Sequence, residues 1–172
     1  MSDKIRTYPG TSLSEDDILQ GKFLSILDDL GGKFAWDTGV AIGAYLESLK
    51  RGVILGAFCS RCRKTVVPPR IVCEMCYQPM DRFVPLEDSG TVNTYSICYV
   101  TWDVKRIKEP EIPAVIEIDG ASPLHGILHK LGEVEPEEVH MGMRVKAVWK
   151  PGADRQGAIT DILYFRPFNE EG

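Results

Sequence analysis

Two cysteine pairs, Cys59-Ser-Arg-Cys62 and Cys73-Glu-Met-Cys76, decide how the middle of this sequence folds. Each pair has the C-x-x-C spacing of a tight turn whose backbone N–H groups point at the sulfurs, and ten residues separate the two pairs. Four thiolates complete a tetrahedral shell around a metal ion and leave no open position, which is typical of a structural site. We therefore assign Cys59, Cys62, Cys73 and Cys76 to a structural Zn²⁺ ion, which holds together an element with too little core to fold alone.

Iron in a rubredoxin-like site is the chemical alternative to zinc. A redox function is disfavoured, because neither pair sits at the strand-to-helix turn of a βαβ unit. The apolar run from Gly52 to Phe58 predicts a strand that leads into the first pair, so the cysteine region is expected to be a zinc ribbon. The fifth cysteine, Cys98, lies in another predicted strand, and we expect a small core residue there and not a nucleophile.

Two helices are predicted before the ribbon. Ser14 is a suitable N-cap, and an apolar face at helical spacing follows it, with Gly31-Gly32 as its end; that face comprises Leu19, Phe23, Ile26, Leu27 and Leu30. A second helix should begin near Asp37 and stop at Gly52, with Val40, Tyr45, Leu46 and Leu49 as its apolar residues. The two helices either pack on the rest of the chain or leave an apolar stripe for a partner protein.

The sequence after the ribbon predicts five short strands with a small helical insertion, Val134–Val139, before the fourth. The strands are expected at Thr91–Trp102, Pro113–Asp119, Leu124–Leu131, Met143–Lys150 and Ala158–Phe165. Five strands favour a small closed barrel of OB type over a sandwich. The predicted fold is therefore mostly β with N-terminal helices: a helical segment (1–52), a rubredoxin-like zinc ribbon (53–85) and an OB-type barrel with a C-terminal tail (86–172).

The charge is unevenly distributed. The chain has 172 residues, 44% of them hydrophobic, and its 20 basic and 25 acidic residues give a formal net charge of −5. These values are ordinary for a globular protein and are not those of a disordered chain. Residues 50–70 nevertheless contain six basic residues and no acid. This span is either a solvated surface or an anion site; the residues expected to hold phosphate groups are Arg61, Arg63, Lys64 and Arg70.

Other functional classes find little support in the sequence. We find no signal peptide and no apolar run long enough to cross a membrane, so we expect a cytoplasmic protein. No Ser-His-Asp order, Walker loop or dinucleotide-binding turn is present. His125 and His129 are spaced i, i+4 on a strand-like segment and are expected at ordinary surface or barrel positions.

The motif set resembles the acyl-CoA-associated zinc-ribbon/OB proteins, a family long known as a domain of unknown function. The matching stretches cover about residues 45–168; they are Gly56–Cys62, Pro68-Pro-Arg70, Cys73–Cys76, Gly90–Tyr95, Ile112–Ile118, Gly142–Val145 and Phe165–Phe168. The resemblance implies a non-catalytic accessory subunit that pairs with a thiolase-superfamily enzyme. The partner would supply the nucleophile and the oxyanion hole.

Several assemblies are consistent with this resemblance. Related proteins work with archaeal acetoacetyl-CoA thiolase, with thiolase-like aldolases of steroid breakdown and with benzoylsuccinyl-CoA thiolase, and we favour a dedicated two-subunit thiolase. The small subunit would stabilise the complex and contribute to binding CoA or acyl-CoA. The alternative is a nucleic-acid-binding ribbon/OB module with Tyr95, Tyr99 and Trp102 as stacking residues. The acidic barrel region argues against this alternative, because polyanion binding depends on basic surface.

Overall fold

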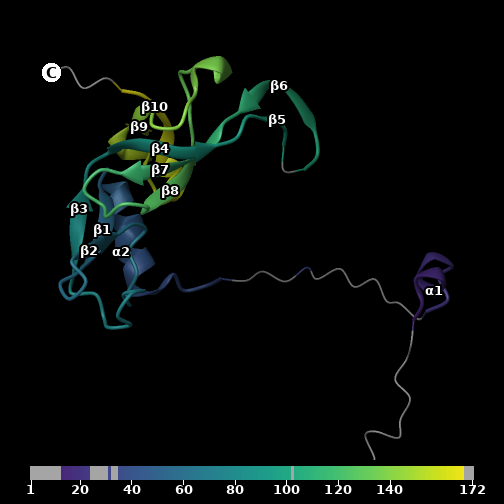
Figure 1. The fold of residues 1–172 in the computed structure, drawn as a ribbon, viewed down its shortest axis with the longest axis horizontal. Helices are drawn as coiled ribbons and strands as arrows, with labels where there is room; N and C mark the ends of the chain where they lie inside the picture. Colours follow the sequence, from purple (N-terminus) through teal and green to yellow (C-terminus); the bar gives the residue numbers. More distant parts are fainter. Residues whose placement is uncertain (1–12, 24–30, 32–34, 102, 169–172) are drawn as a thin grey trace, which may run out of the picture. The chain divides into compact units, whose positions relative to one another are not determined.

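The computed structural model describes residues 13–23, 31, 35–101 and 103–168. They belong to two compact units, Met1–Trp36 and Asp37–Gly172, and each unit is described by itself. The elements (Figure 1) are, in chain order, α1 (Glu15–Leu19), α2 (Gly39–Lys50), β1 (Ile54–Cys59), β2 (Lys64–Val66), β3 (Arg82–Leu86), β4 (Ser89–Tyr95), β5 (Cys98–Val100), β6 (Arg106–Glu111), β7 (Pro113–Ile118), β8 (Gly126–Lys130), the 3-10 helix η2 (Pro136–Glu138), β9 (Arg144–Trp149), the 3-10 helices η3 (Gly152–Asp154) and η4 (Ile159–Asp161), and β10 (Ile162–Pro167).

The helix of the first unit is shorter than the sequence predicts. Ser14 caps it as expected, in a reciprocal capping box with Asp17. The helix then ends at Leu19, because the Gly21 backbone turns to φ +65° and the N–H groups of Gly21 and Lys22 bond back to the carbonyls of Ile18 and Asp17. A single helix through Phe23 is therefore wrong. The other predicted apolar positions, Ile26, Leu27 and Leu30, lie outside the described residues.

Helix α2 begins the second unit and ends where the sequence predicts. Gly52 has φ +80°, and the N–H groups of Gly52 and Val53 bond to the carbonyls of Leu49 and Ser48. A side chain at Gly52 would also collide with the Arg155 guanidinium, since an added Cβ would lie 2.2 Å from one of its nitrogens. The expected apolar residues Tyr45, Leu46 and Leu49 face the protein, whereas Val40, in the first turn, is 75% exposed.

The zinc-ribbon region forms a three-stranded antiparallel sheet in the order β2-β1-β3. The central strand β1 is the strand expected before the first cysteine pair. It pairs with β2 from Ala57↔Val66 to Cys59↔Lys64, and with β3 from Ile54↔Leu86 to Phe58↔Arg82. Pairing with β2 on one side and with β3 on the other therefore fixes the position of β1, whose last residue is Cys59.

A barrel sheet of five strands is confirmed, and the bounds of the first and fifth strands differ from those predicted. The five strands form one antiparallel sheet in the order β10-β9-β4-β7-β8, and a bridge between Leu131 and Phe165 brings the two edge strands together. This order is that of a partly open OB-type barrel, and η2 lies before the fourth strand as predicted. The fifth strand starts later than expected, because Ile159–Asp161 turns as a 3-10 helix. Gly90 lets β4 approach β7 closely, since a Cβ there would lie 2.2 Å from the Glu117 carbonyl oxygen.

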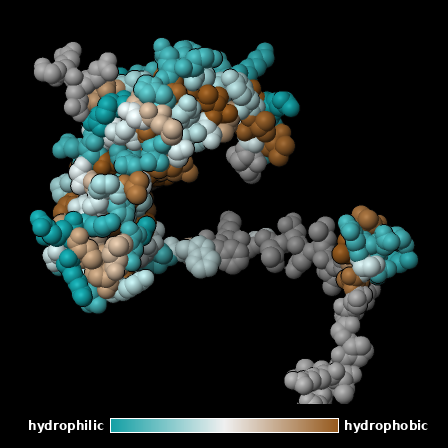
Figure 2. All heavy atoms as spheres, in the orientation of Figure 1, coloured by the Kyte–Doolittle hydropathy of each residue, from teal (hydrophilic) through white to brown (hydrophobic). Residues whose placement is uncertain are grey.

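The first predicted barrel strand is in fact two strands. β4 leaves the barrel after Tyr95, and Cys98 begins β5, which pairs with β6 in a separate two-stranded hairpin. Cys98 is therefore half-buried and not a core residue. The hairpin leads away from the barrel (Figure 1), and it carries apolar side chains exposed by 39–82%, at Ile97, Tyr99, Val100 and Val104. Figure 2 shows brown, apolar residues over this hairpin.

One hydrophobic core joins the helix, the ribbon and the barrel. Tyr45 and Leu49 of α2 and Ile54 of β1 belong to the same buried cluster as the inward residues of all five barrel strands. Burying a side chain of this size contributes about 1.5–3 kcal/mol. The helix and the base of the ribbon are thus held on the barrel. Helix α2 therefore packs on the rest of the chain, which is the first of the two interpretations that the sequence left open. Among the described residues, no helix has the length and apolar character needed to cross a membrane.

Candidate functional site: a four-cysteine metal centre

Two hairpin-like loops bring the four cysteines together. Cys59 is the last residue of β1, and Cys62 lies in the turn from β1 to β2. Cys73 and Cys76 lie in the long connection from β2 to β3, which is folded back on itself by a bridge between Val72 and Pro79. The Tyr77 N–H bonds to the Cys73 carbonyl oxygen at 2.9 Å, so that this second loop makes a full turn around its cysteine pair.

The sulfur geometry fits a tetrahedral ion. The four Sγ atoms all lie within 4.8 Å of one another, and Cys59 Sγ and Cys76 Sγ are 3.7 Å apart. With Zn–S bonds of about 2.3 Å, an ideal tetrahedron has sulfurs about 3.8 Å apart. Cys59 and Cys73 are 1% exposed, so the set is closed on its inner side and offers no coordination position for a substrate. The arrangement can hold a metal and can stabilise the ribbon.

The backbone and the neighbouring sulfurs shift the pKa values of the cysteine thiols. The N–H groups of Cys76 and Met75 lower the pKa of the Cys73 thiol to about 7, against the opposing effect of burial. Hydrogen bonding with the Cys76 sulfur first of all, then burial, and to a smaller extent repulsion from the neighbouring sulfurs, raise the pKa of the Cys62 thiol to about 12. A divalent cation removes this repulsion, and metal binding therefore releases protons.

The residues that follow the two pairs have an uncommon backbone conformation. Arg63 and Tyr77 stand directly after Cys62 and Cys76, and their φ angles are +55° and +56°. Glycine adopts this left-handed region most easily, and other residues do so at a cost. Both loops accept this cost at the same position, which indicates that the turn around each sulfur pair requires the left-handed residue.

A carboxylate locks the first cysteine loop to the strand that follows the second. Asp81 accepts hydrogen bonds from the Ser60 N–H at 2.6 Å and from the Ser60 hydroxyl at 3.0 Å. These two hydrogen bonds hold the pKa of Asp81 below its ordinary value, and the bond from the Ser60 N–H has the larger effect. The Arg82 guanidinium next to it lies 4.3 Å from the centre of the Phe58 ring. Sequence reasoning missed Asp81, because its partner Ser60 lies 21 residues away and no strand was predicted at β3.

A second carboxylate links the ribbon to the barrel. Glu74, between Cys73 and Cys76, forms an ion pair with Arg70, and its Oε1 lies 3.5 Å from Nε2 of His125. His125 precedes β8 of the barrel, and its side chain is 11% exposed. Close by, Thr65 of β2 and Ser122 exchange two hydrogen bonds of 2.9 Å. The sequence suggested no contact for His125, because its partner is 51 residues away.

The basic span divides into paired and unpaired residues. Arg51 pairs with Glu47, and Arg70 pairs with Glu74. Arg61 and Arg63 are exposed in the first cysteine loop and Lys64 is half-buried at the start of β2, and no ion pair involves these three among the described residues. The predicted anion-binding residues are therefore not equivalent: three keep an available positive charge, and Arg70 already has a carboxylate partner.

The comparisons with known proteins match both halves of the second unit. Residues 46–78 match the family model described as ChsH2, rubredoxin-like zinc ribbon domain, and residues 83–150 match that described as ChsH2, C-terminal OB-fold domain. A DUF35 domain-containing scaffold protein of Methanocaldococcus jannaschii is 26% identical over 143 residues, which cover 80% of this chain and 98% of that protein.

Two solved structures share the fold. The Ltp2-ChsH2(DUF35) aldolase aligns with a TM-score of 0.56 and 20% identity, over 78% of this chain and 98% of the matched one. A DUF35-family protein of unknown function from Sulfolobus solfataricus aligns with a TM-score of 0.52 and 24% identity, over 61% and 75% of the two chains. At these identities the structures show the fold alone. The predicted resemblance is confirmed: the chain contains a ChsH2-type zinc ribbon followed by a ChsH2-type OB-fold domain, and is a homologue of the DUF35 proteins.

Proposed function

We propose that this chain is the non-catalytic subunit of a hetero-oligomeric acyl-CoA thiolase, and that a structural Zn²⁺ ion holds its ribbon in shape. The observation that carries the proposal is the closed four-cysteine site, fused through one hydrophobic core to the barrel. Such a site builds a rigid element and offers a substrate no coordination position. A relative described as a scaffold protein and a fold shared with a chain of an aldolase complex support the same role.

The enzyme partner in this proposal is a thiolase-superfamily protein. Its active site supplies the nucleophile, and this chain supplies surface and stability. Within this class, an aromatic-degradation enzyme such as benzoylsuccinyl-CoA thiolase and an acetoacetyl-CoA thiolase are the two candidate assemblies. The proposal keeps the cytoplasmic location expected from the sequence, a reducing compartment in which the cysteines stay available as metal ligands.

Co-expression tests the partnership. The tagged chain is produced with a thiolase-superfamily protein from the same organism as the candidate partner, and separately with a thiolase that is active without a small subunit. We expect the first enzyme to co-purify in a fixed ratio and the second to be absent from the eluate. Recovery of neither enzyme, or of both, would show that the chain is not a dedicated subunit.

We further propose that Arg61, Arg63 and Lys64 contribute to binding the phosphate groups of CoA or acyl-CoA in the complex, with Arg70 as an additional neighbour. The three available cations lie on or next to one rigid turn, and phosphate is a ligand that such groups bind well. Charge reversal of Arg61, Arg63 and Lys64 should raise the KM for the CoA substrate while the zinc content stays at that of the wild type. The matched control is Lys108→Glu on β6. An unchanged KM in the triple variant would make the three residues plain surface.

The nucleic-acid alternative gains no support from the fold. Tyr95 packs against the barrel core, whereas Tyr99 is 49% exposed on the β5–β6 hairpin. The two aromatic side chains therefore do not form a common stacking platform, and Trp102 lies outside the described residues. A salt-sensitive shift of single-stranded DNA or RNA by the zinc-loaded chain at micromolar concentration would restore this alternative.

A further inference from the structure

The opening of the barrel contains a cavity that the proposed scaffold role does not use. β8 and β10 are the edge strands of the five-stranded sheet, and they meet at one end, where the Gly132 N–H bonds to the Phe165 carbonyl oxygen at 2.9 Å. Between β8, the end of β9, η4 and the start of β10 lies a cavity of about 440 Å³. This volume is within the range of about 300–1,000 Å³ that small-molecule sites occupy.

The walls of the cavity are aliphatic. Leu128 comes from β8, Ile159 from η4, and Ile162 and Leu163 from β10. Ile162 is buried, but Leu128 is 68%, Ile159 40% and Leu163 38% exposed. Apolar surface gains about 25 cal/mol for each Å² removed from water, so an apolar occupant would be stabilised by these walls.

The polar groups at the cavity are mainly cationic. Lys130 and Lys150 line it, and Lys130 forms no ion pair within the described part of the chain. The Lys150 ammonium lies 3.9 Å from an Asp161 carboxylate oxygen. Burial lowers the pKa of His129, the third basic lining residue, so its ring is neutral at pH 7 and adds no charge. The cavity therefore combines apolar walls with the ammonium group of Lys130 and with that of Lys150, which also faces the Asp161 carboxylate.

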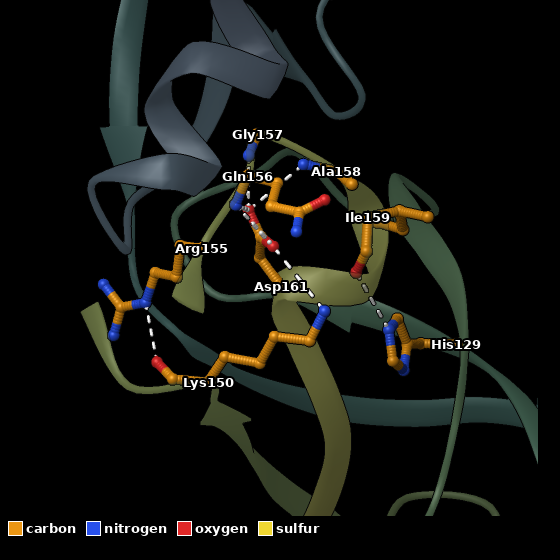
Figure 3. A network of polar contacts seen from close by, with 8 residues as sticks. All are labelled: His129, Lys150, Arg155, Gln156, Gly157, Ala158, Ile159 and Asp161. Atoms are coloured by element: carbon orange, nitrogen blue, oxygen red, sulfur yellow. Dashed lines mark hydrogen bonds and ion pairs between the residues drawn. The ribbon is translucent and has the colours of Figure 1, made fainter. Parts of the chain in front are cut away.

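The carboxylate that pairs with Lys150, that of Asp161, is already occupied by backbone donors. Figure 3 shows Asp161 facing the loop that precedes it, where it accepts from the N–H groups of Gln156, Gly157 and Ala158 at 2.7–3.1 Å. Asp161 is 0% exposed, and its carboxylate faces these donors and Lys150 and not the solvent. The same bonds fix η4, which makes this wall of the cavity a rigid one.

His129 adds an unsatisfied atom. Its Nε2 lies 3.4 Å from the Ile159 carbonyl oxygen (Figure 3), which makes Nε2 the donor, and its ring packs edge-on against Phe165. Its Nδ1 is buried and makes no hydrogen bond. Unpaired buried polar atoms are rare and costly, and they are tolerated most often where a ligand or an ordered water completes the site.

We propose that this cavity binds a small anionic molecule with an apolar body, in which a carboxylate or phosphate group pairs with Lys130 and Lys150 and the body lies against Leu128, Ile159 and Leu163. The inference does not rest on the proposed thiolase partnership. It requires only the folded, metal-loaded chain.

Octanoate, octyl phosphate and octanamide are suitable probes, because they share one apolar chain and differ in the head group. In ¹H–¹⁵N spectra of the zinc-loaded full chain, we expect octanoate and octyl phosphate to shift the amides of residues 128–130 and 159–163. Octanamide should bind much more weakly. The tighter of the two anions then identifies the head group as a carboxylate or a phosphate. Equal binding of octanamide, or shifts outside these residues, would overturn the proposal.

Two variants separate a built site from a non-specific apolar surface. Lys130→Gln should weaken binding of the anions by about tenfold, which is the size expected for a lost charge-assisted hydrogen bond. Leu163→Asp should abolish binding, because it places a carboxylate on the apolar wall. Lys108→Gln, an exposed lysine on β6, is the matched control and should bind as the wild type does. If Lys130→Gln and Lys108→Gln bind equally well, the cavity is not an anion site.

Discussion

The loop before β10 depends on one buried side chain, the Asp161 carboxylate, and removal of this carboxylate is therefore a direct test of the structure. This side chain is fully buried and accepts four hydrogen-bond contacts of 2.7–3.1 Å from three successive backbone N–H groups, those of Gln156, Gly157 and Ala158. Each hydrogen bond to a charged group contributes about 1.5–3 kcal/mol, and the loss of one partner leaves donors without acceptors. We expect Asp161→Ala to lower the free energy of unfolding by about 3–5 kcal/mol, a large part of the 5–15 kcal/mol typical of a domain.

The pH dependence gives this prediction a second check. Burial alone would raise the pKa of Asp161, but the three N–H donors outweigh it and leave the pKa below its ordinary value of 3.8. The carboxylate therefore contributes its full stability above pH 3.8, and this contribution is lost as the pH falls through the lower, folded-state pKa. The difference in stability between the wild type and Asp161→Asn should be constant from pH 8 to 5 and shrink only in stronger acid.

Urea unfolding of the zinc-loaded chain, followed by tryptophan fluorescence, measures these differences. Asp154→Ala is the matched control, because Asp154 is an exposed acid in η3 of the same connection; its cost should stay within about 0.5 kcal/mol. If Asp161→Ala and Asp154→Ala have the same stability, the carboxylate does not organise the loop and the reasoning fails.

Three other outcomes are expected. Cys73→Ser should lose the bound metal and the near-UV signal of the ribbon, whereas Cys98→Ser should keep one metal ion per chain by atomic absorption; equal metal content in the two variants would contradict the four-cysteine site. A chelator such as EDTA should unfold the ribbon of the wild type reversibly, with recovery on addition of Zn²⁺, as circular dichroism will show. Gly52→Ala should destabilise the chain by about 1–3 kcal/mol, because Gly52 has a positive φ and an added Cβ would collide with Arg155. Gly43→Ala, in the middle of α2, should stabilise the chain by up to about 1 kcal/mol. A higher melting temperature for Gly52→Ala than for Gly43→Ala would refute this.

Local sequence patterns predicted the elements whose causes are local. The two cysteine pairs, the glycine that ends α2 and the alternating apolar residues of the barrel strands each act over a few residues. The core position of Tyr45 and Leu49 also followed from helical spacing. These predictions held because capping, metal-ligand spacing and strand periodicity depend on neighbours in the chain.

Errors arose where the decisive partner is distant or absent. Residues 95–100 have the same β-forming composition on both sides of the point where the chain leaves the barrel, so that no local signal separates β4 from β5. The contacts of Asp81 with Ser60 and of His125 with Glu74 join positions 21 and 51 residues apart. No spacing rule connects such pairs, and only the folded chain shows them.

The proposed function is that of a zinc-stabilised subunit of a thiolase-superfamily enzyme. The most direct measurement is size-exclusion chromatography with light scattering of the purified enzyme and the chain, followed by a thiolysis assay of each peak. We predict that the zinc-loaded chain and the enzyme elute as one complex with thiolysis activity, and that Cys73→Ser neither enters the complex nor supports activity. Separate elution at micromolar concentrations, together with full activity of the enzyme alone, would contradict the account.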